Sequence, residues 1–325
     1  MGNAIEERDN AITGVLVSVV IAMIAFLLSN LHRALDSLVV SIIIGILFRN
    51  IFDNRLGLER GISLVIRYAI PIGIASYGTQ LTFKGGTFIF WLQALIPLLL
   101  LFSLTIVFSR IFGLTQNLRL LLASGLSICG ASAIAIVSPL IKAKDEETSI
   151  AVISITAVGL IGVLFYPMIM DWFKIPERVF AFLTGATLPM LGQVELVSAT
   201  AGKAAFMLAT QIKLLRIATL GIFIPIIFYL YRKEDGKKLY LPWYIIVFVV
   251  SAIAFNLIGY LHSIRGYIEP ISRFSLSAGI AAIGLSVNLE SIMEIGPKPL
   301  IVHLISWIIV VFLVLTAFQY ILPNI

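Results

Sequence analysis

The segment Arg67–Lys84 (RYAIPIGIASYGTQLTFK) recurs near the end of the chain as Arg273–Glu290 (RFSLSAGIAAIGLSVNLE), without a gap and 206 positions later. Five of the eighteen positions are identical, and two of the five are glycines inside an apolar segment. Duplicated, glycine-interrupted hydrophobic segments in the two halves of a membrane protein point to a transporter binding site. The alternative interpretation is that the glycines only let two helices pack closely.

The composition indicates a membrane protein. Hydrophobic residues make up 60% of the chain, charged residues only 12%, and the mean hydropathy is +1.05. Crossing a hydrocarbon core takes about 20 apolar residues. Six charge-free runs reach this length: Asn10–His32, Gly85–Ser109, Leu120–Ile141, Thr148–Met170, Leu239–Ile264 and Pro299–Ile325. Five shorter runs bring the expected number of transmembrane segments to about eleven: Ser37–Phe48, Tyr68–Phe83, Val179–Val194, Ile217–Tyr231 and Phe274–Leu289.

The loops between these runs are short and leave no room for a soluble catalytic or nucleotide-binding domain. No GxxxxGK[ST] motif is present, so nothing suggests coupling to ATP hydrolysis in this chain. We expect an all-α polytopic protein with a single membrane domain over residues 1–325. Its first repeat half is expected at 11–175, with an extra N-terminal helix, and its second half at 176–325.

The basic residues predict the orientation in a cell membrane. If all eleven segments cross, thirteen basic residues lie on the side of the N-terminus and six on the other. The first set is Arg8, Arg49, Arg55, Arg60, Arg110, Arg119, Lys174, Arg178, Arg232, Lys233, Lys237, Lys238 and Lys298; the second is Arg33, Lys84, Lys142, Lys144, Lys203 and Arg265. The larger set marks the cytoplasmic side, so we expect the N-terminus inside and the C-terminus outside. The net charge of +6 therefore comes from basic residues that lie between the spans, and it does not indicate nucleic-acid binding.

Two further segments predict interrupted helices. Gly130-Ala131-Ser132 and Gly185-Ala186-Thr187 each lie inside an apolar run. Glycine can end one helix and a hydroxyl can cap the next, and such a break in lipid must be buried in protein or face a wet cavity. The freed backbone N–H groups would favour an anion. The alternative is a pair of continuous helices with small packing faces.

The direction of these two segments leaves a question open. In the eleven-segment count they run the same way through the membrane, whereas Arg67–Lys84 and Arg273–Glu290 run in opposite directions as an inverted repeat requires. Either one segment between the two Gly-Ala-Ser/Thr motifs does not cross, or the motifs are not related by symmetry.

Buried charged and polar residues supply candidate ligands. Lys213 and Arg216 are three residues apart and share a helix face, which we expect to line a substrate path or to face an acidic partner such as Glu195. Gln193 is a further candidate for solute binding. The residues proposed for coupling to H+ or Na+ are Glu195, Ser138, Thr79, Gln80 and Asn288. Neither His262 nor His303 has a second ligand at metal spacing, and Cys129 is the only cysteine, so we expect no metal site and no other cofactor.

These motifs resemble the YeiH-type sulfate-exporter family over nearly the whole chain. The resemblance depends most on Cys129-Gly130-Ala131-Ser132-Ala133-Ile134-Ala135, with support from Tyr77–Phe83, Gly185–Thr187, Lys213–Arg216 and Gly284-Leu285. That family is similar in pattern to bile-acid-symporter-like carriers. The resemblance implies two discontinuous helices that cross near the membrane midplane at Gly130–Ser132 and Gly185–Thr187. One departure is Pro189-Met190, where His-Glu is common in the family, and this departure affects the expected coupling or substrate.

The sequence therefore favours a secondary transporter, most simply an exporter, for a small anion such as sulfate, an organosulfonate or a carboxylate. It would work by alternating access coupled to H+ or Na+. An uncoupled anion or solute channel would use the same helix ends. An enzyme is not expected, because no acid–base, nucleophile or metal constellation is visible. The expected partners are the small anionic solute and the lipid bilayer, and a homodimer is left open.

Overall fold

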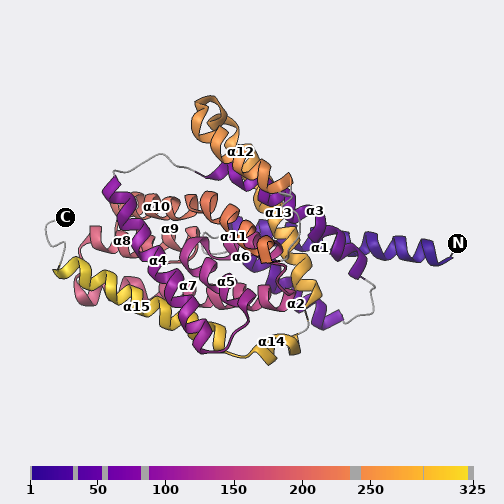
Figure 1. Ribbon diagram of the computed structural model, residues 1–325, viewed down its shortest axis with the longest axis horizontal. Helices are drawn as coiled ribbons and strands as arrows, with labels where there is room; N and C mark the ends of the chain where they lie inside the picture. Colours follow the sequence, from indigo (N-terminus) through magenta and orange to yellow (C-terminus); the bar gives the residue numbers. More distant parts are fainter. Residues whose placement is uncertain are drawn as a thin grey trace. The chain divides into compact units, whose positions relative to one another are not determined.

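A computed structural model describes residues 2–31, 36–52, 58–81, 88–234, 243–287 and 289–320 (Figure 1). Within these ranges all regular structure is helical, as predicted. The chain divides into two compact units, each built from separated stretches of sequence. The first unit contains Met1–Leu81, Ala135–Ile150 and Gly221–Ile295, and the second contains Thr82–Ile134, Ala151–Leu220 and Gly296–Ile325. The predicted repeat halves at 11–175 and 176–325 remain a prediction, because compactness does not test internal symmetry.

Helices long and apolar enough to cross a membrane occur six times in the described residues. They are Ala11–Ser29, Glu59–Gln80, Ala94–Ile111, Asp145–Phe173, Lys203–Leu230 and Lys298–Ala317. Shorter apolar helices occupy Ser37–Phe52, Ala131–Leu140 and Trp243–Leu257. The multi-pass membrane class is thereby supported, while the count of eleven crossings stays a prediction. Five basic residues used for the orientation, Arg33, Arg55, Lys84, Lys237 and Lys238, lie outside the described residues.

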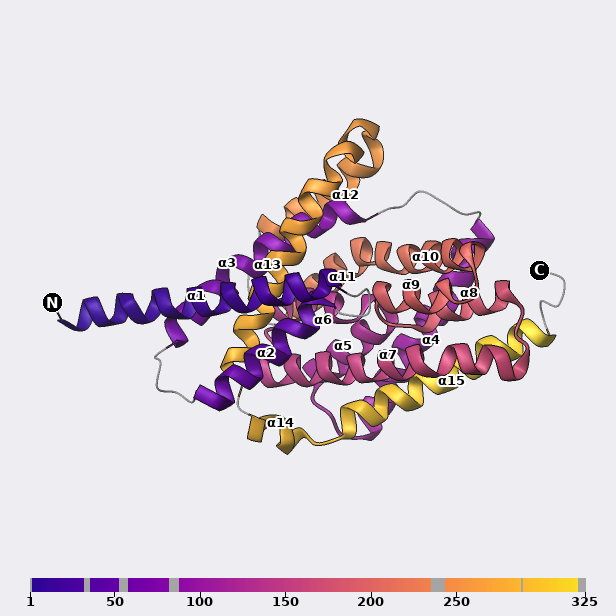
Figure 2. The same cartoon turned by 180° about the vertical axis from the view of Figure 1, so that it is seen from behind.

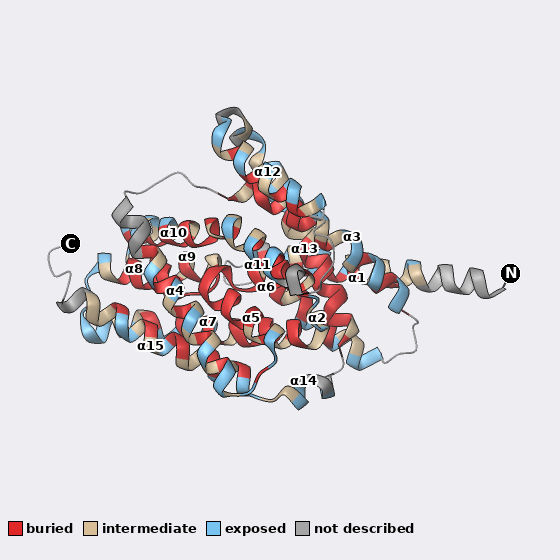
Figure 3. Ribbon diagram, in the orientation of Figure 1, coloured by how far each residue is buried: buried red, intermediate tan, exposed pale blue. Residues whose placement is uncertain are grey.

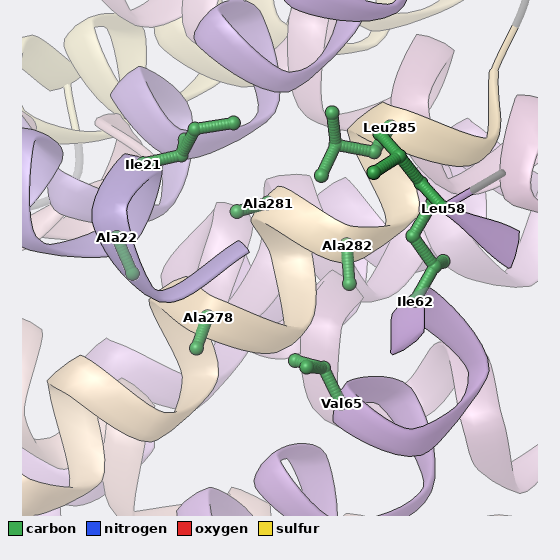
Figure 4. Close-up of a cluster of buried hydrophobic side chains, with 9 residues drawn as sticks. All are labelled: Ile21, Ala22, Leu58, Ile62, Val65, Ala278, Ala281, Ala282 and Leu285. Atoms are coloured by element: carbon green, nitrogen blue, oxygen red, sulfur yellow. The ribbon is translucent and has the colours of Figure 1, made fainter. Parts of the chain in front are cut away.

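The first unit is held together by α13. Its elements are α1 (Gly2–Leu31), α2 (Ser37–Phe52), α3 (Glu59–Tyr77), η2 (Gly78–Gln80), α11 (Leu220–Glu234), α12 (Trp243–Leu257), η4 (Gly259–Ile264), α13 (Arg265–Ser286) and α14 (Leu289–Ile295). Ala278, Ala281, Ala282 and Leu285 form one apolar stripe of α13 at helical spacing. This stripe packs with Ile21 and Ala22 of α1 and with Leu58, Ile62 and Val65 in and before α3 (Figure 4). Small residues on α13 let its neighbours approach closely.

The glycines of the repeated segment make reciprocal contacts between α3 and α13. A methyl group on Gly73 would come within 2.7 Å of Leu276 Cγ, and a methyl group on Gly279 would collide with Ile70. Gly73 and Gly279 stand 206 positions apart, and so do Ile70 and Leu276. The contact of Gly73 with Leu276 and the contact of Gly279 with Ile70 are therefore equivalent: adding 206 to the residue numbers of one repeat turns each contact into the other. This reciprocity is typical of a two-fold related interface.

A second pair of contacts, made with α2 and α12, is related by the same offset of 206 positions. A methyl group on Gly284 would come within 2.7 Å of the Ile42 carbonyl oxygen of α2, and one on Gly78 would collide with the Phe248 carbonyl of α12. Ile42 and Phe248 are again 206 positions apart. The starts of α2 and α12 and the starts of α3 and α13 share this offset. The similarity seen in one segment of sequence therefore extends over two consecutive helices.

The second unit contains the elements that carry the candidate site. They are α4 (Phe88–Ile111), α5 (Gln116–Ser124), the π-helical turn η3 (Gly125–Cys129), the start of α6 (Ala131–Leu140), most of α7 (Asp145–Phe173), α8 (Glu177–Thr187), α9 (Leu191–Ala199), α10 (Lys203–Ala218) and α15 (Lys298–Tyr320). Figures 1 and 2 both show α8, α9 and α10 side by side. Glu177 fixes this arrangement, because its carboxylate accepts a hydrogen bond at 3.1 Å from the Ala205 amide in the first turn of α10. Figure 3 shows that α5 is buried over most of its length.

Replacing Gly284 with Ala should lower the stability of the protein by about 1–3 kcal/mol, because the added methyl group would force α13 away from the α2 backbone. The melting temperature in detergent would report the loss. Gly266→Ala at the start of α13 is the matched control, since no atom lies within 4 Å of the added methyl group. Equal melting temperatures for the two variants would contradict the close packing of α2 and α13.

Candidate functional site

The first interruption lies at Gly130, as the sequence predicted. α5 passes into the π-helical turn η3, and the Gly130 amide donates to the Gly125 carbonyl at 2.8 Å. Gly130 then adopts φ 69° and ψ −132°, a conformation that residues with a side chain rarely adopt, and α6 begins at Ala131. The break is therefore encoded by the glycine, and the wider turn before it is a frequent feature of functional helices.

The second interruption lies three residues beyond its predicted position. Gly185, Ala186 and Thr187 are all helical residues of α8, and the extended residues are Leu188 and Met190. Pro189 explains the difference, because it lacks an N–H and disfavours helical geometry in the residue before it. Gly185 instead permits close packing, since a methyl group there would come within 2.5 Å of the Ala209 carbonyl oxygen of α10. The prediction of a break at Gly185–Thr187 was wrong in its position.

The two interruptions touch each other. A methyl group on Gly130 would lie 2.8 Å from Met190 Cγ and 3.3 Å from the Pro189 carbonyl oxygen. Both interruptions therefore lie at one point of the second unit. Gly130 is required there for two reasons, its positive φ angle and the close approach of Met190.

Arg216 of α10 donates hydrogen bonds to the carbonyl ends of both interrupted helices. Its Nε donates to the Ser127 carbonyl at 2.9 Å, and its Nη2 donates to the carbonyls of Leu126 and Ser127 at 2.8 and 2.7 Å. Its Nη1 donates to the carbonyls of Gly185 and Leu188 at 3.1 and 3.2 Å. All five N–H groups of the guanidinium are used, and the side chain is 0% exposed.

Lys213, one turn earlier on α10, completes the same arrangement. Its ammonium group donates to the carbonyls of Ile128, Leu188 and Pro189 at 2.9, 2.9 and 2.5 Å, so its three N–H groups are also used. The residue is 0% exposed. The hydrogen bonds of both cations therefore go to carbonyl oxygens and not to Glu195, which the sequence suggested as an acidic partner. Their predicted role as direct ligands of a solute remains a prediction.

The amide ends of the broken helices have a different environment. The first hydrogen bonds inside α6 and α9 are made by the amides of Ile134 and Val194, so the three amides before each have no carbonyl partner within their own helix. Ser132 is half-buried in the first turn of α6, while Ala131 is fully buried. Gln193 is buried, and its Oε1 accepts from the Met190 amide at 3.2 Å. Gln193 therefore holds the chain at the second interruption.

Thr187 belongs to a polar contact that sequence reasoning missed. Its hydroxyl donates to the Leu183 carbonyl at 2.6 Å and lies 2.5 Å from the hydroxyl of Tyr166 on α7. Because the Thr187 hydrogen is used, Tyr166 is the donor between them. The Tyr166 ring stacks on Trp307 of α15 with a centroid distance of 5.5 Å. The signal in the sequence was a tyrosine and a tryptophan inside apolar spans.

The predicted coupling residues are divided between the two units, and their role in coupling stays a prediction. Thr79, Gln80 and Ser138 belong to the first unit, and Glu195 belongs to the second. Thr79 donates to the Ser76 carbonyl, and Ser138 pairs with Thr148 at 2.6 Å. Asn288 lies outside the described residues. Within the ranges that the structure covers, no group of three or more His, Cys, Asp or Glu side chains could hold a metal ion.

The fold and the site define a multi-pass helical membrane protein with two interrupted helices in contact. The family described as "Conserved hypothetical protein 698" matches residues 13–303, so the chain belongs to that family. A "UPF0324 membrane protein" from Archaeoglobus fulgidus is 34% identical over 79% of this chain and 77% of its own length. The "UPF0324 inner membrane protein YeiH" of Escherichia coli is 28% identical over 78% of this chain and 76% of its own. The YeiH-type resemblance is thereby confirmed, and no solved structure matches the chain.

Lys213→Met should destabilise the protein by about 1–3 kcal/mol, because buried carbonyls would lose their donor. Thermal unfolding in detergent measures the effect. Lys203→Met is the matched control, since Lys203 is an exposed lysine of the same helix, and it should leave the melting temperature unchanged. If both variants had the melting temperature of the wild type, the capping role of Lys213 would be refuted.

Proposed function

We propose that the protein is a secondary transporter for a small anion, working by alternating access coupled to H+ or Na+. The proposal depends on one observation above all. The two interrupted helices meet at Gly130 and Met190, and their carbonyl ends are capped by two buried cations while the amides of the following half-helices have no partner within their own helix. The carbonyl acceptors at the interruptions are therefore already used, and the first backbone N–H groups of α6 and α9 are the donors left for a solute. We propose transport rather than catalysis.

Electrostatics favours a negatively charged solute. The end of a helix is equivalent to about half an elementary charge, positive at the amide end and negative at the carbonyl end. Two carbonyl ends and two amide ends meet here, so their contributions roughly cancel and the charges of Lys213 and Arg216 remain. Glu195 is the carboxylate on α9, and it is half-buried. An anion, alone or together with Glu195, would balance the two cations.

The reciprocal contacts support an inverted repeat, the architecture in which alternating access exchanges two similar conformations. The pairs Gly73–Leu276 and Gly279–Ile70, like Gly78–Phe248 and Gly284–Ile42, are what a pseudo-two-fold axis would produce. An odd number of crossings between the repeats, as in the eleven-segment topology, would invert one repeat relative to the other. We include that topology, with the N-terminus inside, in the proposal.

Purified protein in proteoliposomes should move at least one of sulfate, sulfite, ethanesulfonate and succinate, and labelled anion outside should exchange with unlabelled anion inside. Such counterflow separates a carrier from a channel, which conducts without obligatory exchange. Empty liposomes are the control. The transport proposal would be abandoned if none of the four anions moved with or without a gradient of H+ or Na+, and conductance without counterflow would favour the channel.

Ser132→Asp should abolish stabilisation by the transported anion, because a carboxylate in the first turn of α6 would occupy the amides that we assign to the solute. A ligand at 100 times its dissociation constant raises stability by about 2.7 kcal/mol, which thermal-shift measurements detect. Ser132→Asn, of nearly the same size but neutral, is the matched control and should keep the response. Retention of the response by both variants would place the solute elsewhere.

A further inference from the structure

His303 is a buried titratable group that the proposed site has not used. It lies on α15 and is 0% exposed. Its Nε2 lies 3.0 Å from the Leu122 carbonyl oxygen of α5, and its Nδ1 lies 3.0 Å from the hydroxyl oxygen of Ser154 on α7. All three residues belong to the second unit. An ionisable side chain inside a membrane segment has a functional role more often than not.

The partners of His303 fix its hydrogen atoms. A carbonyl oxygen can only accept, so Nε2 carries the hydrogen that is donated to Leu122. Nδ1 of the neutral ring then accepts from Ser154. The Ser154 hydroxyl has a single hydrogen but two acceptors within reach, Nδ1 at 3.0 Å and the Ala151 carbonyl oxygen at 3.1 Å. Both arrangements of that hydrogen satisfy hydrogen-bond geometry.

This geometry lets His303 accept a proton without moving a heavy atom. A hydronium ion would give its proton to Nδ1 and leave as water, the Ser154 hydrogen would rotate toward the Ala151 carbonyl, and the Ser154 oxygen would accept from the new N–H. No bond other than the new N–H is made. Leu122 stands just before the π-helical turn that leads to Gly130, so the Nε2 hydrogen bond connects the charge on His303 to the first interrupted helix.

A second buried polar group lies on the same helix as His303. Ser306 lies three residues after His303 on the same face of α15, is 0% exposed, and its hydroxyl has no hydrogen-bond partner. A buried hydroxyl without a partner among the described residues can be satisfied by an ordered water or an ion. A water bound at the Ser306 hydroxyl would supply a route for the proton to Nδ1.

Neither hydrogen-bond partner of His303 carries a charge. The charged and titratable residues on the helices around it are mostly at helix ends, and they are Arg110 on α4, Arg119 on α5, Cys129 on η3, Asp145, Glu146, Glu147, Tyr166 and Asp171 on α7, Glu177 and Arg178 on α8, and Lys298 on α15. Arg119 is turned toward the start of α5, where its Nε donates to the Leu114 carbonyl at 2.6 Å. A charge on His303 would therefore be balanced best by the transported anion itself.

We propose that His303 is the proton-binding residue of the transporter and that a proton moves in the same direction as the anion. This inference rests on the proposed function and names its coupling ion. Ser154 and Leu122 position the ring in both protonation states.

The test uses proteoliposomes with labelled sulfate and, separately, ethanesulfonate. Exchange at equal pH measures transport, and uptake against a concentration gradient with acid outside measures coupling. In His303→Gln the amide can still donate to Leu122 but cannot bind a proton, so we expect complete loss of acid-driven accumulation with exchange preserved. His262→Gln is the matched control and should behave as wild type. Ser154→Ala should shift the pH dependence of accumulation toward acid, because the acceptor of the new N–H is removed.

The outcomes separate the two proposals. Acid-driven accumulation that survives in His303→Gln, or its absence in a wild type that exchanges the anion, would overturn the role of His303 and leave the transporter standing. Absence of any exchange in the wild type would overturn the proposed function, and the coupling role with it. If His303→Gln does not fold, the pH shift of Ser154→Ala decides, and an unchanged pH profile would overturn the inference.

Discussion

The structure depends on the hydrogen bonding of two buried cations to the carbonyl ends of two interrupted helices. Inside a membrane no bulk water can satisfy a freed carbonyl, so a break in a helix costs several kcal/mol unless protein groups replace the lost partners. Arg216 and Lys213 supply all of their N–H groups for this purpose. The position of α10 is therefore a condition for both breaks, and Glu177 and the close contact at Gly185 hold α10 in that position.

The same arrangement makes the two sides of each break unequal. On one side the backbone acceptors are satisfied within the protein, and on the other the first amides of α6 and α9 lack partners in their own helices. Under the proposed function, recognition would then rest largely on backbone geometry, with Ser132 and Gln193 as its polar neighbours. A site of this kind selects for charge and size more than for a pattern of side-chain contacts. His303, Ser154 and Leu122 would add a movable charge next to a fixed one.

The sequence predicted the membrane class and the break at Gly130 because both depend on local chemistry, namely apolar length and a glycine with positive φ. It misplaced the second break, because the sequence does not distinguish a glycine that permits close packing from a glycine that ends a helix. In this segment the helix ends just before Pro189 and not at Gly185. It found Lys213 and Arg216 but not their carbonyl partners, because residues 24 to 90 positions apart become neighbours only in the fold. Tyr166 and Trp307 were missed for the same reason, and His303 was considered only as a metal ligand.

The contact between Gly130 and Met190 constrains how this chain can change over time. A larger residue at position 130 would meet Met190 and the Pro189 carbonyl oxygen, and it would be strained by the positive φ angle as well. A branched side chain at 190 would press on the only backbone conformation that lets the first helix restart. Each break therefore limits what the other can accept, because Met190 and the Pro189 backbone fill the space that a side chain at position 130 would need.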